Sequence, residues 1–130
     1  MKTVIFLCGL IGAGKTTYAQ KHFKPFTDLD YMPMYSKKSD QIRLTQRLLK
    51  TNDEVCHITC YPTEEEARAF RGYNKRFVLI DTGIRQAKTN VIIRNRQRDM
   101  INLANVLESN LDLVKKYKNA NVKWEVVKVF

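Results

Sequence analysis

The chain has 130 residues, a length typical of a single domain because one hydrophobic core is usual up to roughly 150 residues. Apolar residues make up 44 % and charged residues 28 %, which excludes disordered and collagen-like classes, and the lack of a run of about 20 apolar residues excludes a membrane span. Lysine and arginine number 23 against 13 acids, so the net charge is +10 and polyanions such as nucleotides or nucleic acid are the expected partners.

The sequence pattern in the first quarter of the chain predicts two strands separated by a helix. A continuous apolar run from Thr3 to Cys8 is typical of a parallel strand that is buried on both faces, and we expect it at the centre of a sheet. A helix is predicted from Lys15 to His22, and a short second strand from Pro25 to Asp28. A loop is expected over residues 31–38, which contain a proline and several polar residues.

The next segment predicts a second helix. Ser39 and Asp40 are good N-cap residues, and the helix is expected to run to Lys50. Its spacing places Leu44 and Leu48 on the inner face.

A third strand and a short helix follow. The strand is predicted from Glu54 to Cys60. Thr63 and Glu66 have the spacing of a capping box, which predicts a helix that begins there and ends near Arg71.

The last part of the chain completes an alternating pattern. A fourth strand is predicted at Phe77–Ile80, a helical region with one break or bend from about Arg85 to Lys118, and a closing strand from Val122 to Phe130. Strands and helices therefore alternate along the whole chain. This order predicts a three-layer α/β/α sandwich on a mostly parallel five-stranded sheet.

The cysteines and one histidine are interpreted as interior residues. Cys8, Cys56 and Cys60 lie in apolar runs, are odd in number and lack the spacing of a zinc site or a disulfide framework. They predict buried thiols in a reducing, cytoplasmic environment. His57 lies in the middle of the third strand and is interpreted as a hydrogen-bonded interior histidine.

The segment between the first strand and the first helix carries the strongest motif. Residues 9–16 read G-L-I-G-A-G-K-T and match the G-x-x-x-x-G-K-[ST] pattern of a phosphate-binding loop. Glycines allow several backbone N–H groups to surround an anion, and the helix N-terminus adds its positive dipole end. We therefore expect the loop to bind the triphosphate of ATP, with GTP as an open alternative. The predicted nucleotide-binding residues are Gly9, Ile11, Gly12, Ala13, Gly14, Lys15, Thr16 and Thr17.

Two residues of this loop have further predicted roles. The ammonium group of Lys15 would reach the β and γ phosphates, and the hydroxyl of Thr16 would ligate Mg²⁺. Phosphoryl transfer also needs a carboxylate near the acceptor hydroxyl. Asp28 and Asp30 follow the second strand, and residues two apart in an extended segment point the same way, into the crevice at the carboxyl end of the sheet. The alternative is that both are solvated loop acids.

A third acid competes for the metal. Residues 77–81 read F-V-L-I-D, four apolar residues followed by an acid, which is the general shape of a second metal-binding motif. Asp81 is thus a metal candidate beside Asp28, or else it caps the following turn.

The predicted helical region after the fourth strand is strongly basic. Arg94 and Arg98 are four residues apart and share one helical face, so their guanidinium groups are expected to converge on the phosphate, whereas Arg96 points elsewhere and stays solvated. A solvated basic face is the alternative.

With its G-x-x-G-x-G-K-T-T loop, the D-x-D at 28–30 and the R-N-R-Q-R at 94–98, the chain resembles the P-loop kinase superfamily. The similar groups are polynucleotide kinases and small-metabolite kinases such as shikimate and gluconate kinases. The resemblance implies a P-loop NTPase fold in which Asp28 acts near Mg²⁺ through water and Asp30 is the base that contacts the acceptor. It also implies that Arg94 and Arg98 neutralise charge that develops on the γ-phosphoryl group.

The acceptor is predicted from charge. Arg43, Arg47 and Lys50 lie together on the second helix, as in proteins that bind a nucleic-acid backbone. We therefore expect a nucleic-acid 5′-hydroxyl as the acceptor. A small-molecule kinase acting on a nucleoside, a nucleoside monophosphate or another metabolite is the alternative, and a nucleotide-binding module without catalysis is the third possibility. The sequence predicts no membrane partner and leaves the oligomeric state open.

Overall fold

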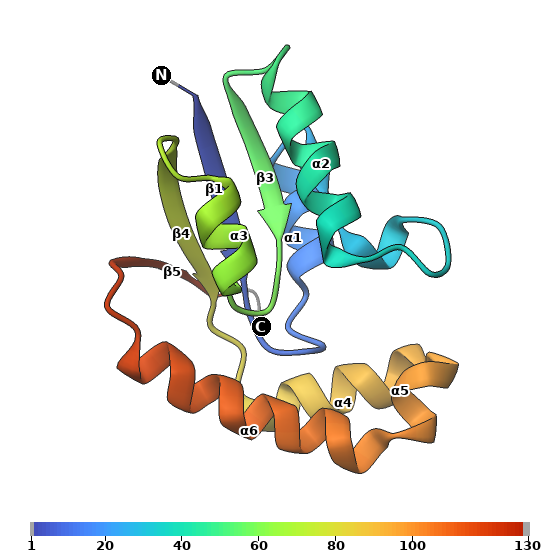
Figure 1. Ribbon diagram of the computed structural model, residues 1–130. Coiled ribbons are helices and arrows are strands. Elements are labelled where there is room, and N and C mark those ends of the chain that lie inside the picture. The colour runs from blue at the N-terminus through green and yellow to red at the C-terminus, as the bar shows by residue number, and fades with distance from the viewer. Residues whose placement is uncertain (1, 129–130) are drawn as a thin grey trace.

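A computed structural model describes residues 2–128, apart from the side chains of residues 97 and 98. Five strands form one sheet in the order β2-β3-β1-β4-β5, and all neighbouring strands are parallel (Figure 1). The strands are β1 (Thr3–Cys8), β2 (Phe26–Thr27), β3 (Glu54–Ile58), β4 (Asn74–Ile80) and β5 (Trp124–Val127). The predicted α/β class and the central position of the first strand are confirmed, and the sheet is fully rather than mostly parallel.

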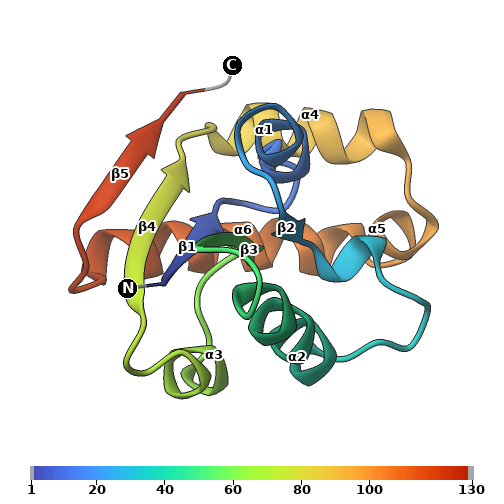
Figure 2. The same cartoon turned by 90° about the horizontal axis from the view of Figure 1, so that it is seen from above.

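Helices cover both faces of the sheet. Helix α1 (Lys15–His22) lies on one face, and α2 (Lys38–Leu49) and α3 (Glu64–Ala69) lie on the other (Figure 2). The central strand serves both faces: Ile5 and Leu7 pack into the core on the α1 side, and its alternate residues pack into the core on the α2 side. A strand buried on both faces is continuously apolar, which is why β1 was easy to identify.

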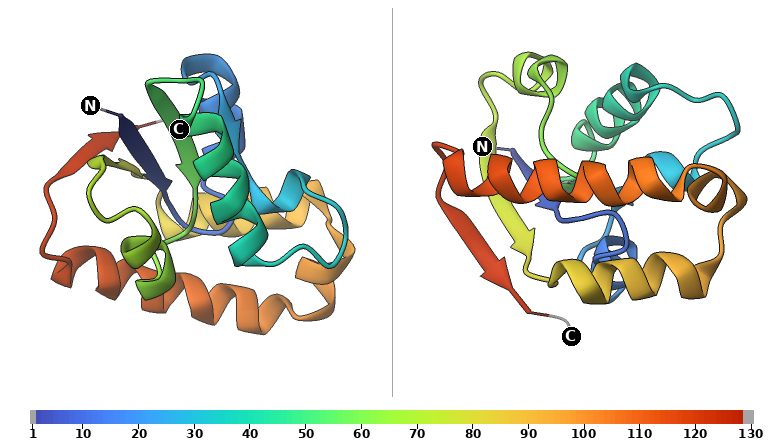
Figure 3. Two further views of the ribbon diagram at one scale, coloured as in Figure 1. Left: turned by 45° about the horizontal axis from the view of Figure 1, so that its top comes forward. Right: turned by 90° about the horizontal axis from the view of Figure 1, so that it is seen from below.

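The C-terminal third lies across the carboxyl ends of the strands. Helices α4 (Ile84–Arg94), α5 (Gln97–Ile101) and α6 (Leu103–Asn119) form this layer (Figure 3). The helical region has two interruptions rather than the one that we expected. Asn95 ends α4 with a left-handed backbone at φ 48°, a conformation that asparagine tolerates better than most residues, and Asn102 separates α5 from α6.

The inner face of α2 differs from the prediction. The helix begins at Lys38, and the carboxylate of Asp40 accepts the backbone N–H of Lys37 at 2.8 Å instead of acting as the N-cap. Leu44 and Leu48 are half-buried. The buried residues are Gln41, Ile42, Thr45 and Leu49. Two of them are polar and bond to interior groups, which a hydrophobic pattern does not reveal.

Other boundaries shift by a few residues. The predicted capping box is present, since Thr63 accepts from the backbone N–H of Glu66 at 3.1 Å, but α3 ends at Ala69. The third strand is two residues shorter than expected, and the fourth begins at Asn74. The end of the predicted closing strand, residues 129 and 130, lies outside the described residues. Within residues 2–128, no helix has both the length and the apolar character needed to cross a bilayer.

Candidate active site

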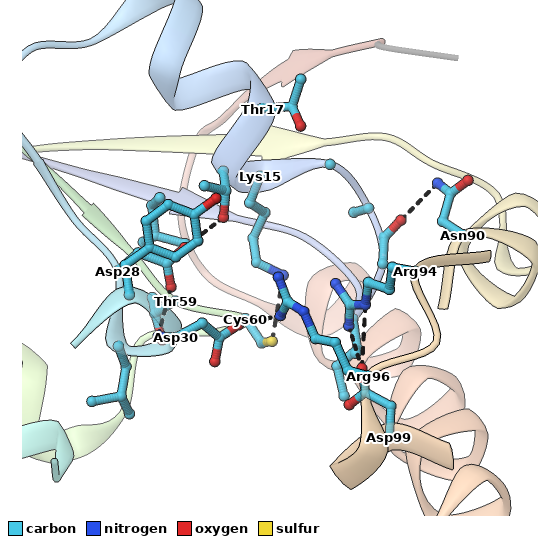
Figure 4. A pocket seen from close by; sticks show the side chains of 18 of the residues that line it. Lys15, Thr17, Asp28, Asp30, Thr59, Cys60, Asn90, Arg94, Arg96 and Asp99 are labelled. Carbon is cyan, nitrogen blue, oxygen red and sulfur yellow. Dashed lines mark hydrogen bonds and ion pairs between the residues drawn. The ribbon is translucent and has the colours of Figure 1, made fainter. Parts of the chain in front are cut away.

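A cavity of about 560 Å³ opens at the carboxyl end of the sheet, within the size range of small-molecule sites. Its walls come from the β1–α1 loop and the start of α1, the short 3₁₀ helix Leu29–Tyr31, the start of α2, residues 58–60 at the end of β3, and the α4–α5 segment. Figure 4 shows Asp28, Asp30 and Thr59 on one side, Arg94 and Asp99 on the other, and Lys15 between them. Ligands of parallel sheets bind at this end because the loops after the strands converge there.

The β1–α1 loop has the backbone that a phosphate-binding loop needs. Gly12 and Gly14 have φ angles of 88° and 93°, which residues with a side chain rarely adopt. A Cβ atom on Gly12 would also lie 2.5 Å from the carbonyl oxygen of Ala87, so this position has no room for a side chain. At Lys15 and the next residues the first turn of α1 lacks intrahelical partners for its N–H groups, and these residues line the cavity.

Three side chains from later in the chain hold this loop. Asn110, fully buried on α6, accepts from the N–H of Ile11 at 2.7 Å and donates to its carbonyl at 3.0 Å. The carbonyl oxygens of Gly12 and Ala13 accept further hydrogen bonds, from Asn90 Nδ2 at 2.8 Å and Thr82 Oγ1 at 3.0 Å respectively. The loop is therefore fixed by the fold, and the Ile11 amide is already engaged within the protein. No motif in the sequence marks these three polar residues.

The predicted phosphate lysine lies against its own loop. Lys15 Nζ donates to the carbonyl oxygens of Gly9 and Leu10 at 3.0 and 2.9 Å, and its contact with Cys60 Sγ is 3.5 Å. Cys60 lies at the edge of the cavity, whereas Cys8 and Cys56 are buried, and burial raises the pKa values of those two thiols. An anionic phosphate is a stronger partner for an ammonium group than a carbonyl, so the lysine would exchange these carbonyls for a phosphate that entered the cavity.

A hydroxyl and a carboxylate meet beside the loop. Thr16 Oγ1 donates to Asp28 Oδ2 at 2.5 Å, and Asp28 is almost fully buried. These two oxygen groups suit Mg²⁺, which is usually held by one or two protein ligands together with phosphate and water oxygens. Within the described residues no three His, Cys, Asp or Glu side chains form a metal cluster, so a metal here would depend on bound phosphate.

Asp30, the second predicted acid, also lies at this cavity, but its backbone is not extended as expected. Asp28 is extended, but Leu29–Tyr31 form the 3₁₀ helix, and the N–H of Asp30 donates to Asp28 Oδ1 at 3.0 Å. Both acids nonetheless line the cavity. Asp30 Oδ2 accepts from Arg96 Nη1 at 3.0 Å.

The arginines are arranged differently from the prediction. Because α4 ends at Arg94 and the chain turns at Asn95, Arg94 and Arg96 both line the cavity, and the prediction that Arg96 points away and stays solvated is wrong. Arg94 donates from Nη2 to Asp99 Oδ2 at 2.9 Å. The backbone of Arg98 belongs to α5, beyond the interruption, so the expected common helical face with Arg94 does not exist. The side chain of Arg98 lies outside the described residues.

Asp81 is not brought to this cavity. It is exposed, 4.0 Å from Lys128 Nζ, and it is absent from the described residues that line the cavity. The next residue, Thr82, turns inward to the phosphate loop instead. Of the two metal candidates, the structure places Asp28 beside Thr16.

A buried polar network lies beside the cavity. Both ring nitrogens of His57 have partners: Nε2 lies 2.5 Å from Glu66 Oε2 and Nδ1 lies 2.7 Å from Thr45 Oγ1, so the interior-histidine interpretation is confirmed. Burial lowers the pKa of His57, although Glu66 opposes the shift. Burial alone raises the pKa of Glu66, but the His57 hydrogen bond and the charge of Lys38 outweigh it and bring this pKa to about 2. Within the network, burial favours the neutral form of His57, and the hydrogen bond from His57 and the charge of Lys38 favour the anionic form of Glu66.

Comparison with known protein families finds no match to this sequence, and comparison with curated proteins finds none either. Solved structures do match. A gluconokinase from Sinorhizobium meliloti 1021 has a TM-score of 0.60 at 14 % identity, covering 98 % of this chain and 82 % of its own. A deoxyadenosine kinase from M. mycoides with bound dATP has a TM-score of 0.58 at 13 % identity, covering 99 % and 90 %. The chain therefore has the fold of P-loop kinases.

Proposed function

We propose that the chain is an ATP- and Mg²⁺-dependent kinase that transfers the γ-phosphoryl group to a hydroxyl of a small molecule. The observation that carries the proposal is the composition of one cavity. A fixed phosphate loop with Lys15 faces the carboxylate of Asp30 and the guanidinium groups of Arg94 and Arg96. Phosphoryl transfer depends mainly on positioning and charge stabilisation, and these groups can provide both.

The loop binds the triphosphate. Its N–H groups and Lys15 hold the phosphate oxygens, with Lys15 leaving the carbonyls of Gly9 and Leu10. Thr16 and Asp28 would hold Mg²⁺, which supplies positive charge to the phosphates when it is bound.

Asp30 orients the acceptor hydroxyl and takes its proton. The acceptor oxygen forms a bond to the γ-phosphorus, the bond from that phosphorus to the bridging oxygen breaks, and ADP leaves with the electron pair. Arg96 moves from Asp30 to the transferred group, where its charge and that of Arg94 stabilise the transition state. The arginines in these roles are thus Arg94 and Arg96, and a contribution from Arg98 stays a prediction.

A small-molecule acceptor is favoured over a nucleic-acid end. The neighbouring structures are described as a gluconokinase and a deoxyadenosine kinase, and nothing in the comparisons supports a nucleic-acid acceptor. Nucleic acid is kept as a second candidate because of one feature. Arg43, Arg47 and Lys50 surround a surface hollow of about 440 Å³ together with Tyr73.

The test is to incubate the protein with labelled ATP, Mg²⁺ and a panel of sugar acids, nucleosides and 5′-hydroxyl oligonucleotides. We expect a small molecule to acquire the label. Labelling of oligonucleotides alone would replace this acceptor class with nucleic acid. A protein that binds ATP and labels nothing in the panel would instead be the non-catalytic module.

A variant of the acceptor-side acid tests the mechanism. Asp30→Asn should lower the transfer rate by about 10²–10⁴-fold, because the base is lost, and leave ATP binding nearly unchanged. Rates and nucleotide affinity are measured on the same preparation. Transfer at the wild-type rate in this variant would remove Asp30 from its role.

A further inference from the structure

Lys38 is a cation on the acceptor side that the mechanism above does not use. Four described cations line the cavity, and three of them come from the phosphate loop or the α4–α5 segment: Lys15, Arg94 and Arg96. Lys38 comes instead from the first residue of α2. It bonds to Thr59, which Figure 4 shows on the same side of the cavity as Asp30.

The ammonium group of Lys38 is held from within the protein. It donates to Gln41 Oε1 at 3.0 Å and lies 3.4 Å from both Glu66 Oε2 and Thr59 Oγ1. About a quarter of the Lys38 side chain, 27 %, remains exposed, whereas the Glu66 side chain is fully buried. A solvated surface lysine has no such set of partners, so the position of this charge at the cavity is fixed in advance.

The carboxylate behind Lys38 does not depend on it alone. Glu66 also interacts with the His57 ring at 2.5 Å, accepts from the backbone N–H of Thr63 at 2.8 Å and accepts from Thr59 Oγ1 at 3.3 Å. The contacts of Lys38 with this carboxylate and with Thr59, at 3.4 Å each, are longer than its hydrogen bond to Gln41 at 3.0 Å. Since Lys38 lines the cavity, its ammonium group can exchange these long contacts for an incoming anion without leaving Glu66 unpartnered.

We propose that Lys38 binds an oxyanion of the acceptor, so that the preferred substrate is a small hydroxyl compound carrying a carboxylate or a phosphate group. This inference rests on the proposed kinase function. Gln41, Thr59 and Glu66 are the positioning residues that hold the ammonium group at the cavity.

Matched acceptor pairs test the charge requirement. Gluconate and glucitol differ by a carboxylate, and 2′-deoxyadenosine 3′-monophosphate and 2′-deoxyadenosine differ by a phosphate at a position away from the 5′-hydroxyl. The wild-type protein should have at least a tenfold lower KM for the anion of one pair. The pair that shows the preference identifies carboxylate or phosphate. Equal KM values within both pairs would overturn the proposal.

Substitution of the lysine tests the residue. Lys38→Met should raise the KM for the preferred anion by about 10–100-fold, with little change in the KM for ATP or for the neutral partner, as expected when a charged hydrogen bond is lost. Lys38→Arg should restore part of the loss. Lys37→Met is the matched control, since Lys37 is exposed and is not among the described residues that line the cavity. An equal change in KM for both members of a pair would indicate a merely structural role and contradict the proposal.

A double variant and a binding measurement cover the remaining outcomes. Should Lys38→Met fold poorly because Glu66 loses a counter-ion, Lys38→Met/Glu66→Gln removes both charges and should show the same selective rise in KM. Should no acceptor be phosphorylated, the proposed function fails. Calorimetry then decides this inference, with gluconate, glucitol and the nucleoside pair titrated into protein loaded with a non-hydrolysable ATP analogue and Mg²⁺. Binding of an anion that Lys38→Met weakens would support the inference. Absence of such binding would overturn it.

Discussion

The phosphate loop and the arginine segment at residues 94–99 form opposite parts of one cavity, but they are built differently. The loop is a continuous motif whose carbonyl and N–H groups are held by buried or partly buried side chains from α4, α6 and the β4–α4 connection. The arginine segment is an interruption between helices whose charged groups are held by ion pairs with Asp30 and Asp99. The backbone of the loop is thus held in place by the fold, whereas the side chains of Lys15, Arg94 and Arg96 would each have to exchange partners to reach a phosphate.

The loop lysine should have the largest effect. Lys15→Ala removes the charge at the transferred phosphate and should lower kcat by about 10³-fold while the fold is retained. Lys21→Ala is the matched control, because Lys21 is exposed on the same helix outside the lining of the cavity. Circular dichroism and single-turnover transfer are measured for both. Near-normal turnover in Lys15→Ala would mean that the loop does not act on the phosphates.

The arginine segment should give the next largest effect. Arg96→Ala should lower kcat by about 10²-fold, because Arg96 is the guanidinium that bonds to Asp30 at the cavity. Arg85→Ala, an exposed arginine on α4, controls for the change in net charge. Arg98→Ala tests the sequence prediction directly. A loss in Arg98→Ala with normal turnover in Arg96→Ala would reverse the assignment.

The difference between these regions explains what sequence could predict. The loop was identified because its motif residues lie within one short, continuous stretch of the sequence. Strand β1 was identified because a strand buried on both faces is a continuous apolar run. Arg96 was missed because its direction depends on a left-handed Asn95, which no periodicity marks. Asn110 was missed because the sequence of an amphipathic helix does not distinguish a buried, hydrogen-bonded asparagine from a solvated one.

Substitution of the side chains that hold the β1–α1 loop should have a smaller effect, and that effect should be on the stability of the fold. Asn110→Ala leaves the N–H and carbonyl of Ile11 unpaired and should lower the free energy of unfolding by about 1–3 kcal/mol, with weaker ATP binding. Asn90→Ala removes the bond to the Gly12 carbonyl and an exposed bond from Gln86 Nε2, and it should cost about 1 kcal/mol or less because this side chain is only half-buried. Urea unfolding compares the two. Equal costs would contradict the expectation that the two hydrogen bonds from buried Asn110 hold the loop more strongly than the bond from Asn90.

Acidification should lower the stability of the fold through the buried network of His57 and Glu66. The pKa of His57 is lowered by burial, so the unfolded chain takes up this proton first, and stability falls as pH drops below about 6.5, by at most roughly 1.4 kcal/mol per pH unit. The pKa of Glu66 is lower in the folded protein than in the unfolded chain, so ionised Glu66 stabilises the fold above about pH 4.5. That contribution is lost as the pH falls towards 2.

Unfolding measured at pH 7 and 5.5 checks this sign. His57→Gln should flatten the difference between the two pH values. A wild-type protein that is more stable at pH 5.5 would indicate that His57 is held as a cation, contrary to the network described above.

The central claim is that the β1–α1 loop binds the triphosphate of the donor nucleotide. A crystal structure with a non-hydrolysable ATP analogue and Mg²⁺ tests it most directly. The predicted result is that phosphate oxygens lie on the N–H groups at the start of α1 and that Lys15 Nζ has left Gly9 and Leu10 for the β and γ phosphates. A nucleotide bound elsewhere, or a Lys15 still on those two carbonyls beside a bound nucleotide, would contradict the account.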